Sequence, residues 1–174
     1  MELPNVKGHV FWLLFSDKSN RWLNENMKRV RKQVKSPSFI PHLTLLPAPE
    51  MPDERVFGKL DQFTLQQLPF QLPLTGIGHD DFPYQAFYLE ASRSIPLLKL
   101  RKDLAELFGL EPNENYRPHV SLLYGSYSEN EIEMLKALVA WPESRAVDIT
   151  EIALVRLEGR PEEWEVIYQS KFGV

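Results

Sequence analysis

The feature that most constrains the fold is a short motif that occurs twice in the sequence. Its first copy runs Pro-His-Leu-Thr-Leu-Leu from Pro41, and its second copy runs Pro-His-Val-Ser-Leu-Leu from Pro118. Successive side chains of a β-strand point to opposite faces. Each copy therefore predicts a strand that presents a histidine and a hydroxyl on one face and buries apolar residues on the other.

In the first copy His42 and Thr44 share a face, and in the second copy His119 and Ser121 do. Each copy thus places an imidazole beside a hydroxyl on a rigid strand. If the two copies face each other, they form a small site with two acid/base groups and two hydroxyl donors. We expect such a site to hold a phosphate group, because hydroxyls and a protonated imidazole both donate hydrogen bonds to phosphate oxygens.

The segments around the two copies follow the same order in both halves of the sequence. Hydrophobic periodicity and turn residues predict strand, helix, Pro-His strand, helix and strand in each half. The predicted ranges are 9–15, 16–35, 40–47, 53–63 and 70–78 in the first half, then 84–91, 97–107, 117–125, 128–139 and 147–157, with a last strand at 164–170. This repetition predicts one domain, residues 1–174, with two lobes related by approximate two-fold symmetry and the histidine strands at their seam.

Length and composition narrow the class of protein. A chain of 174 residues with 43% hydrophobic and 25% charged residues is typical of a single soluble globular domain. The net charge of −4 argues against a long nucleic acid as the partner, because such binding usually requires a basic surface. The absence of cysteine excludes disulfides, a thiol nucleophile and thiolate zinc sites. The sequence shows neither a signal-peptide pattern nor a membrane-length apolar run, so we expect a cytoplasmic protein without membrane contact.

The histidine pair suits the hydrolysis of a cyclic phosphate. An imidazole titrates near neutral pH, so one ring can take a proton from water while the other gives a proton to the leaving ribose oxygen. The hydroxyls of Thr44 and Ser121 can stabilise the charge that develops on the outer phosphate oxygens. No metal or other cofactor is expected, because neither motif offers a second histidine or a carboxylate at ligand spacing. His9 and His79 lie outside the motifs and are weaker candidates for ligand contact.

Together the two motifs resemble the paired His-x-Thr/Ser signatures of the 2H phosphoesterase superfamily. The segment Ser-Leu-Leu-Tyr-Gly at 121–125 resembles its cyclic phosphodiesterase branch in particular. The resemblance implies a bilobal α+β fold of the LigT-like kind, with two antiparallel sheets flanking a central cleft and helices outside. It also implies metal-independent hydrolysis of ADP-ribose 1″,2″-cyclic phosphate to the 1″-phosphate, and of nucleoside 2′,3′-cyclic phosphates to 2′-phosphates.

The same resemblance implies a role for each motif residue. His42 and His119 are the expected acid/base pair, and Thr44 and Ser121 are the expected phosphate donors. Tyr124 matches a tyrosine that follows the second motif of the family, and it is expected to line the phosphate pocket. For the direction of proton transfer we favour His119 as the base and His42 as the acid.

Trp12 is a further candidate, because strand pairing is expected to place the first strand beside a histidine strand. Its indole can stack on a nucleobase there, and a core position explains it equally well.

Two other interpretations of the function remain open. One is an RNA-end enzyme, either 2′-5′ RNA ligase-like or an RNA 2′,3′-cyclic phosphodiesterase. The basic run at 28–35 is the visible track for RNA, although such a run is usually a solvated helix face. The other is a nucleotide-binding module without catalysis, which has no need of two titrating groups. The favoured partner is a small cyclic phosphate nucleotide, bound by a monomer.

Overall fold

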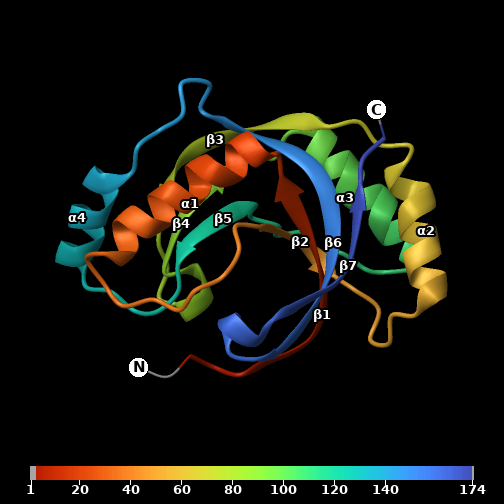
Figure 1. Cartoon of the computed structure of the whole chain (residues 1–174), viewed down its shortest axis with the longest axis horizontal. Coiled ribbons are helices and arrows are strands. Elements are labelled where there is room, and N and C mark those ends of the chain that lie inside the picture. Colours follow the sequence, from red (N-terminus) through yellow and green to blue (C-terminus); the bar gives the residue numbers. More distant parts are fainter. Residues whose placement is uncertain (1–2, 174) are drawn as a thin grey trace.

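The computed structural model describes residues 3–173, which form seven β-strands and four α-helices (Figure 1). In chain order they are β1 (Val6–Phe15), α1 (Asp17–Arg31), β2 (Leu43–Pro47), α2 (Glu54–Thr64), β3 (Phe70–Gly78), β4 (Phe87–Ala91), α3 (Ile95–Phe108), β5 (His119–Leu123), α4 (Glu129–Leu138), β6 (Ala146–Gly159) and β7 (Glu165–Lys171). Two single-turn 3₁₀ helices, Pro83–Gln85 and Pro161–Glu163, precede β4 and β7. The predicted α+β class is confirmed.

All seven strands belong to one antiparallel sheet with the order β1-β2-β5-β4-β3-β6-β7, and β1 also pairs with β6. Six of the strands form two three-stranded units, β6-β1-β2 and β3-β4-β5, which are joined along both edges, and β7 extends the first unit by pairing with β6. One junction is the pairing of β3 with β6, and the other is a single pair, Leu43 with Val120, between β2 and β5. The two predicted sheets are therefore two parts of one continuous sheet, because the histidine strands pair with each other at the seam.

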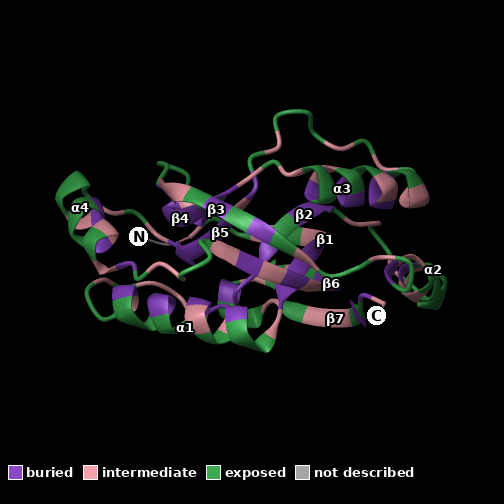
Figure 2. Ribbon diagram, turned by 90° about the horizontal axis from the view of Figure 1, so that it is seen from above, coloured by how far each residue is buried: buried purple, intermediate pink, exposed green. Residues whose placement is uncertain are grey.

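The two lobes do not coincide with the two halves of the sequence. β3 comes from the first half but pairs with β4, and β6 comes from the second half but pairs with β1. The helices are exchanged between the halves in the same way, since α1 from the first half packs against β5, and α3 from the second half packs against β2. Figure 2 shows α1 and α3 on opposite sides of the sheet. The halves therefore interlock, instead of forming one lobe each as the repeat alone suggested.

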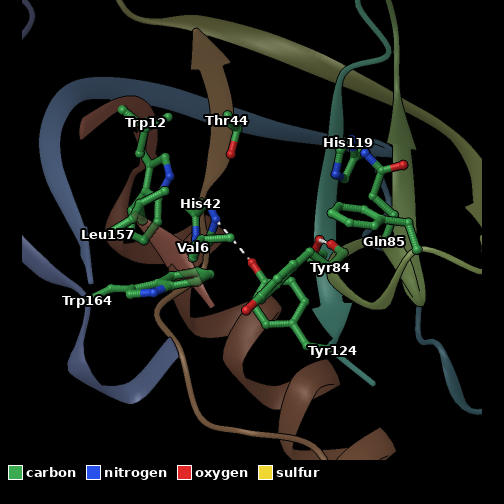
Figure 3. A pocket seen from close by; sticks show the side chains of 13 residues that line it. Val6, Trp12, His42, Thr44, Tyr84, Gln85, His119, Tyr124, Leu157 and Trp164 are labelled. Atoms are coloured by element: carbon green, nitrogen blue, oxygen red, sulfur yellow. Dashed lines mark hydrogen bonds between the residues drawn. The ribbon is translucent and has the colours of Figure 1, made fainter. Parts of the chain in front are cut away.

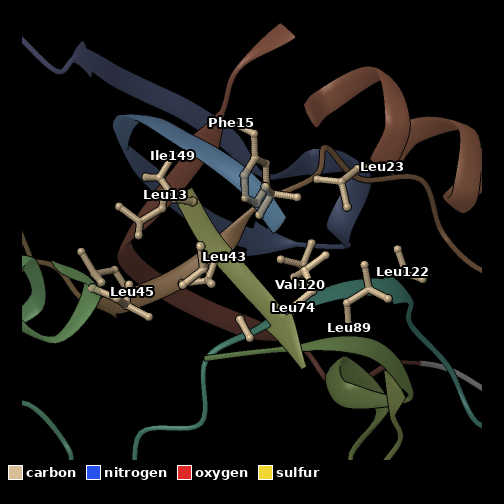
Figure 4. Packing of buried hydrophobic residues seen from close by; sticks show 14 of the residues in the cluster. Leu13, Phe15, Leu23, Leu43, Leu45, Leu74, Leu89, Val120, Leu122 and Ile149 are labelled. Atoms are coloured by element: carbon tan, nitrogen blue, oxygen red, sulfur yellow. The ribbon is translucent and has the colours of Figure 1, made fainter. Parts of the chain in front are cut away.

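The alternation predicted for the two histidine strands is confirmed. Leu43 and Leu45 of β2, and Val120 and Leu122 of β5, are buried in the main hydrophobic core (Figure 4). This core continues under α1 and α3, whose apolar faces also contribute to it. The side chains between these residues point to the opposite face of the sheet, where they line a pocket.

The first helix is shorter than its periodicity predicted. α1 ends at Arg31 with Lys32 as its C-cap, and the N–H of Gln33 closes a last turn on the carbonyl of Val30. The predicted end near residue 35 was therefore wrong by about four residues. Residues 33–37 form a loop that lines a second cavity.

Two further boundaries test the local sequence signals. The strand predicted at 84–91 begins only at Phe87, because Pro83–Gln85 folds into a 3₁₀ turn. The capping box predicted from Ser128 and Glu131 is present at the start of α4.

Within the described residues 3–173, none of the helices has the length and apolar character needed to span a bilayer.

Candidate active site

The structure brings the six predicted site residues together around one pocket of about 220 Å³. They are Trp12 from β1, His42 from the residue before β2 and Thr44 within β2, and His119, Ser121 and Tyr124 from β5 and the residue that follows it. Figure 3 shows His42 and His119 on opposite walls of this pocket, with Tyr84 and Tyr124 between them. Two imidazoles from distant parts of the chain therefore face one small cavity.

The pairing of β2 with β5 explains this convergence. The residues that follow the two histidines, Leu43 and Val120, pair directly across the seam. When this antiparallel register is continued, each histidine lies opposite the hydroxyl residue of the other motif. The two motifs thus line one pocket, in which each imidazole shares a face with the hydroxyl of its own motif.

The two imidazoles are held by the same local hydrogen bond. Nδ1 of His42 lies 2.8 Å from the carbonyl oxygen of Ile40, and Nδ1 of His119 lies 2.9 Å from that of Arg117. A carbonyl can only accept, so Nδ1 carries a proton in both rings. Each Nε2 atom is thereby left available to accept or donate a proton in the pocket. The proline between acceptor and histidine fixes its own φ angle, which favours the same geometry in both motifs.

His42 is packed between aromatic rings. Its imidazole stacks on the indole of Trp12, with ring centroids 3.6 Å apart and planes 8° from parallel. The phenolic oxygen of Tyr124 lies 3.4 Å from Nε2 of His42 and donates to it. Burial lowers the pKa of His42 to about 4, although its bond to the Ile40 carbonyl acts in the opposite direction. The positive charge of a protonated His119 contributes to this lowering of the pKa, and His42 is therefore neutral in the free site at pH 7.

The base-stacking role of Trp12 stays a prediction, and the surroundings of the indole favour the alternative, a core position. The indole is only 3% exposed, and the face toward the pocket is covered by the imidazole of His42. Trp164 lies against it in an edge-on arrangement at 6.0 Å. In this structure the indole holds the His42 ring in position and leaves that face closed to a nucleobase.

His119 sits in a more open setting than His42. Its ring is half-buried and lies 4.9 Å from the ring of Tyr88. Burial lowers the pKa of His119, the Arg117 carbonyl raises it, and the Arg117 guanidinium lowers it again. That guanidinium is itself bound to Asp80 and to Gln85, each at 3.2 Å.

The two predicted phosphate donors differ in their present hydrogen bonds. The hydroxyl of Ser121 is buried and donates to the Tyr84 carbonyl at 3.2 Å. Thr44 is exposed and points into the pocket mouth (Figure 3). Burial raises the pKa of Tyr124, so its hydroxyl stays protonated and can act as a further donor. Thr44 is thus free to bind a ligand at once, whereas Ser121 must first rotate away from the carbonyl.

Sequence reasoning missed the remaining lining residues, which are Val6, Val10, Phe82, Tyr84, Gln85, Leu157 and Trp164. They come from β1, the turn before β4, the end of β6 and the residue before β7, and no local motif marks them. None of the lining residues, all of them within 3–173, is a lysine, arginine, aspartate or glutamate. A bound anion in this pocket is therefore balanced by a protonated imidazole and by hydroxyl donors.

The two remaining histidines were weaker candidates for contact with a ligand. His9 and His79 do not line the pocket. Within residues 3–173, no group of three or more histidine, cysteine, aspartate or glutamate residues is placed to hold a metal ion.

A family model described as the 2′-5′ RNA ligase superfamily matches residues 40–161, a range that includes both Pro-His motifs. The chain belongs to this superfamily, the 2H phosphoesterases. Membership supports a phosphoesterase or 2′-5′ RNA ligase-like activity, which is broader than the cyclic phosphodiesterase branch that the sequence suggested. No curated protein matches the sequence significantly.

Solved structures of other proteins share the fold of this 2H phosphoesterase. E. coli LigT in complex with 3′-AMP superposes with a TM-score of 0.61 at 16% identity, over 97% of this chain and 99% of that chain. TT0787 of Thermus thermophilus has a TM-score of 0.61 at 19% identity, over 94% and 97%. A further protein, described as a phosphoesterase, has a TM-score of 0.62 at 15% identity, over 97% and 99%. These likenesses confirm the LigT-like fold.

In this 2H phosphoesterase the two histidines differ in how easily they take a proton. His42 is buried more deeply than His119, so it loses more hydration on becoming charged. The predicted direction of proton transfer, with His42 as the acid, requires a protonated His42. In the free site this residue is neutral, so the direction requires a bound substrate that raises the pKa of His42.

Proposed function

We propose that the protein is a cyclic phosphodiesterase that opens ribose cyclic phosphates by two-histidine acid/base catalysis, without a metal ion. The expected substrates are ADP-ribose 1″,2″-cyclic phosphate and nucleoside 2′,3′-cyclic phosphates. The observation that carries the proposal is the placement of two imidazoles, each with Nε2 available for proton transfer, on opposite walls of a pocket of about 220 Å³.

The proposed reaction is a single displacement at phosphorus. A water oxygen forms a bond to phosphorus while His119 takes a proton from that water at Nε2. The bond from phosphorus to one ribose oxygen breaks, and His42 gives its Nε2 proton to that oxygen. For a nucleoside 2′,3′-cyclic phosphate the 3′ oxygen leaves, and the product is the 2′-phosphate. A proton exchange with solvent returns both rings to their starting states.

Electrostatics of the pocket support the protonation of His42 on substrate binding. The cyclic phosphate carries one negative charge, and no lysine or arginine lines the pocket within residues 3–173. An anion and an imidazolium interact strongly where water is excluded, so the pKa of His42 rises when the phosphate binds. The indole of Trp12 stacks on this ring and favours its charged form through a cation–π interaction.

The outer phosphate oxygens need donors that remain in place during attack. Thr44 and Ser121 are proposed to supply hydroxyls, and Tyr124 a phenolic O–H. Tyr124 donates to Nε2 of His42 in the free site, so phosphate binding requires it to exchange this nitrogen for a phosphate oxygen. Donors directed at developing charge typically contribute about 3 kcal/mol each to transition-state stabilisation.

An RNA end that bears a 2′,3′-cyclic phosphate is a second candidate substrate. The superfamily description, 2′-5′ RNA ligase, favours it. One of the related E. coli LigT structures holds 3′-AMP, which supports a nucleotide ligand for the present pocket as well.

The proposal is tested by incubating the protein with adenosine 2′,3′-cyclic phosphate in the presence of EDTA and identifying the product by phosphorus NMR. We expect the 2′-phosphate, and we expect no product from a variant in which both histidines are replaced by alanine. A requirement for added metal contradicts the two-histidine mechanism. A 3′-phosphate product contradicts the proposed branch, and tight binding without turnover supports a binding module instead.

A further inference from the structure

The histidine pocket is too small for most of a nucleotide. Its volume of about 220 Å³ lies below the range of roughly 300–1,000 Å³ that is typical of ligand sites. A ribose with its cyclic phosphate fits such a volume, but the groups attached to the 5′ oxygen of that ribose must extend elsewhere. The pocket also offers no lysine or arginine within 3–173 to a second phosphate.

A larger cavity of about 1050 Å³ adjoins the histidine pocket. The two cavities share Tyr84 and Tyr124, which stand between the histidines in Figure 3. Three segments build most of the rest of its wall, namely 33–37 after α1, 125–127 after β5 and 159–162 at the turn between β6 and β7, and Leu3, Asn5 and Glu131 complete it. Figure 1 shows the hairpin of β6 and β7 beside the beginning of β1, at one end of the histidine strands.

This second cavity supplies the cations that the histidine pocket lacks. Lys35 and Arg160 line it, and neither side chain forms a salt bridge within the described residues 3–173. Two carboxylates also line it, but both are engaged. Glu131 accepts from the N–H and hydroxyl of Ser128, and Glu162 accepts from the N–H of Ser38. The cations are therefore available to a ligand.

A third positive group, Arg31, lies near Tyr124 and Tyr127. The guanidinium of Arg31 is 4.7 Å from the ring centre of Phe39, and its charge acts on both Tyr124 and Tyr127. Its Nε atom and one Nη atom are buried and have no hydrogen-bond partner within 3–173. Buried donors without partners are costly, and the carboxylate of Glu162 is one negative charge within the protein that acts on this guanidinium. Three cations, Lys35, Arg160 and Arg31, thus lie around the second cavity together with three carboxylates, Glu131, Glu162 and Glu163, the last of which accepts from the N–H of Arg160.

We propose that the second cavity binds a phosphoryl group on the 5′ oxygen of the ribose that carries the cyclic phosphate, with Lys35 and Arg160 as its cationic contacts. The inference rests on the proposed function, because the histidine pocket must hold the cyclic phosphate. It extends that function to a substrate class, the 5′-phosphorylated ribose cyclic phosphates. An RNA end and ADP-ribose cyclic phosphate both have this chemistry, the first with a phosphodiester and the second with a diphosphate.

The test compares adenosine 2′,3′-cyclic phosphate with its 5′-phosphorylated derivative. We expect kcat/KM to be about tenfold higher for the 5′-phosphorylated substrate, since one hydrogen bond to a charged group contributes about that factor. Lys35→Ala and Arg160→Ala should each reduce this ratio toward one. Lys28→Ala and Arg55→Ala, which remove exposed cations that line neither cavity, are the matched controls and should keep the wild-type ratio.

Equal kcat/KM values for the two substrates overturn the inference and leave the proposed function intact. If neither substrate is turned over, the proposed function fails, and a binding measurement still decides the inference. In that case calorimetry measures the affinities of adenosine 2′-phosphate and adenosine 2′,5′-bisphosphate. We expect the bisphosphate to bind more tightly, and we expect this difference to depend on Lys35 and Arg160. Equal affinities overturn it. A dinucleotide with a terminal cyclic phosphate and ADP-ribose 1″,2″-cyclic phosphate, assayed side by side, identify which source the cavity prefers.

Discussion

Replacement of His42 by asparagine should flatten the pH dependence of stability between neutral and mildly acidic pH. In the folded protein burial lowers the pKa of His42 to about 4 from its ordinary value of 6.5. The unfolded chain therefore binds more protons than the folded protein in this window. It follows that the free energy of unfolding decreases as the pH falls from 6.5 toward 4, and that the full stability is present above pH 6.5.

The magnitude follows from the shift in pKa. A difference of about 2.5 units corresponds to about 3 kcal/mol below both pKa values. At about pH 5 the loss that has accumulated is about 2 kcal/mol, because the folded ring is still neutral there while the unfolded ring is charged. The asparagine variant has no titrating group at this position, so it lacks this loss. His119 and the carboxylates are present in both proteins and cancel in the comparison.

The assay is urea unfolding followed by tryptophan fluorescence at about pH 7.5 and about pH 5 for both proteins. We expect the wild type to lose about 2 kcal/mol more than His42→Asn between these two conditions. The absolute stability of the variant does not matter, because only the change with pH is compared. Parallel pH dependence of the two proteins would refute the argument, since it means that His42 is not held neutral by burial in the folded state.

Three further predictions concern catalysis. The stacked indole of Trp12 favours the imidazolium form of His42. Trp12→Leu should therefore lower the apparent pKa of the limb of the kcat–pH profile that belongs to His42 by about half a unit, and Trp12→Phe should lower it less. A shift of the alkaline limb identifies His42 as the acid, a shift of the acidic limb identifies it as the base, and no shift contradicts the cation–π argument. Thr44→Val should lower kcat about a hundredfold without changing the melting temperature, whereas Ser121→Ala should lower both, because it also removes the donor to the Tyr84 carbonyl. His119→Ala and His42→Ala should each lower kcat by at least about a hundredfold while circular dichroism stays unchanged, and a near-normal rate in either variant removes that histidine from the mechanism.

The sequence alone determined which residues face the pocket within each motif. Side chains alternate along a strand by local geometry, so the spacing of His42 and Thr44 was enough to place them on one face and Leu43 on the other. The same argument placed His119 and Ser121 together. The repetition of the motif then implied that the two faces meet. Capping at Ser128 was also predictable, because it depends on residues only three positions apart.

Tertiary structure alone decided what surrounds those residues. The face-to-face contact of Trp12 with His42, and the presence of Tyr84 and Trp164 in the same pocket, depend on how distant strands pair. The exchange of β3 and β6 between the lobes has the same origin. Local periodicity shows that a strand has a buried face, but it does not show which other strand it pairs with, because pairing is set by the packing of the whole core. The protonation state of His42 follows from that packing, since it is burial that makes the charged ring costly.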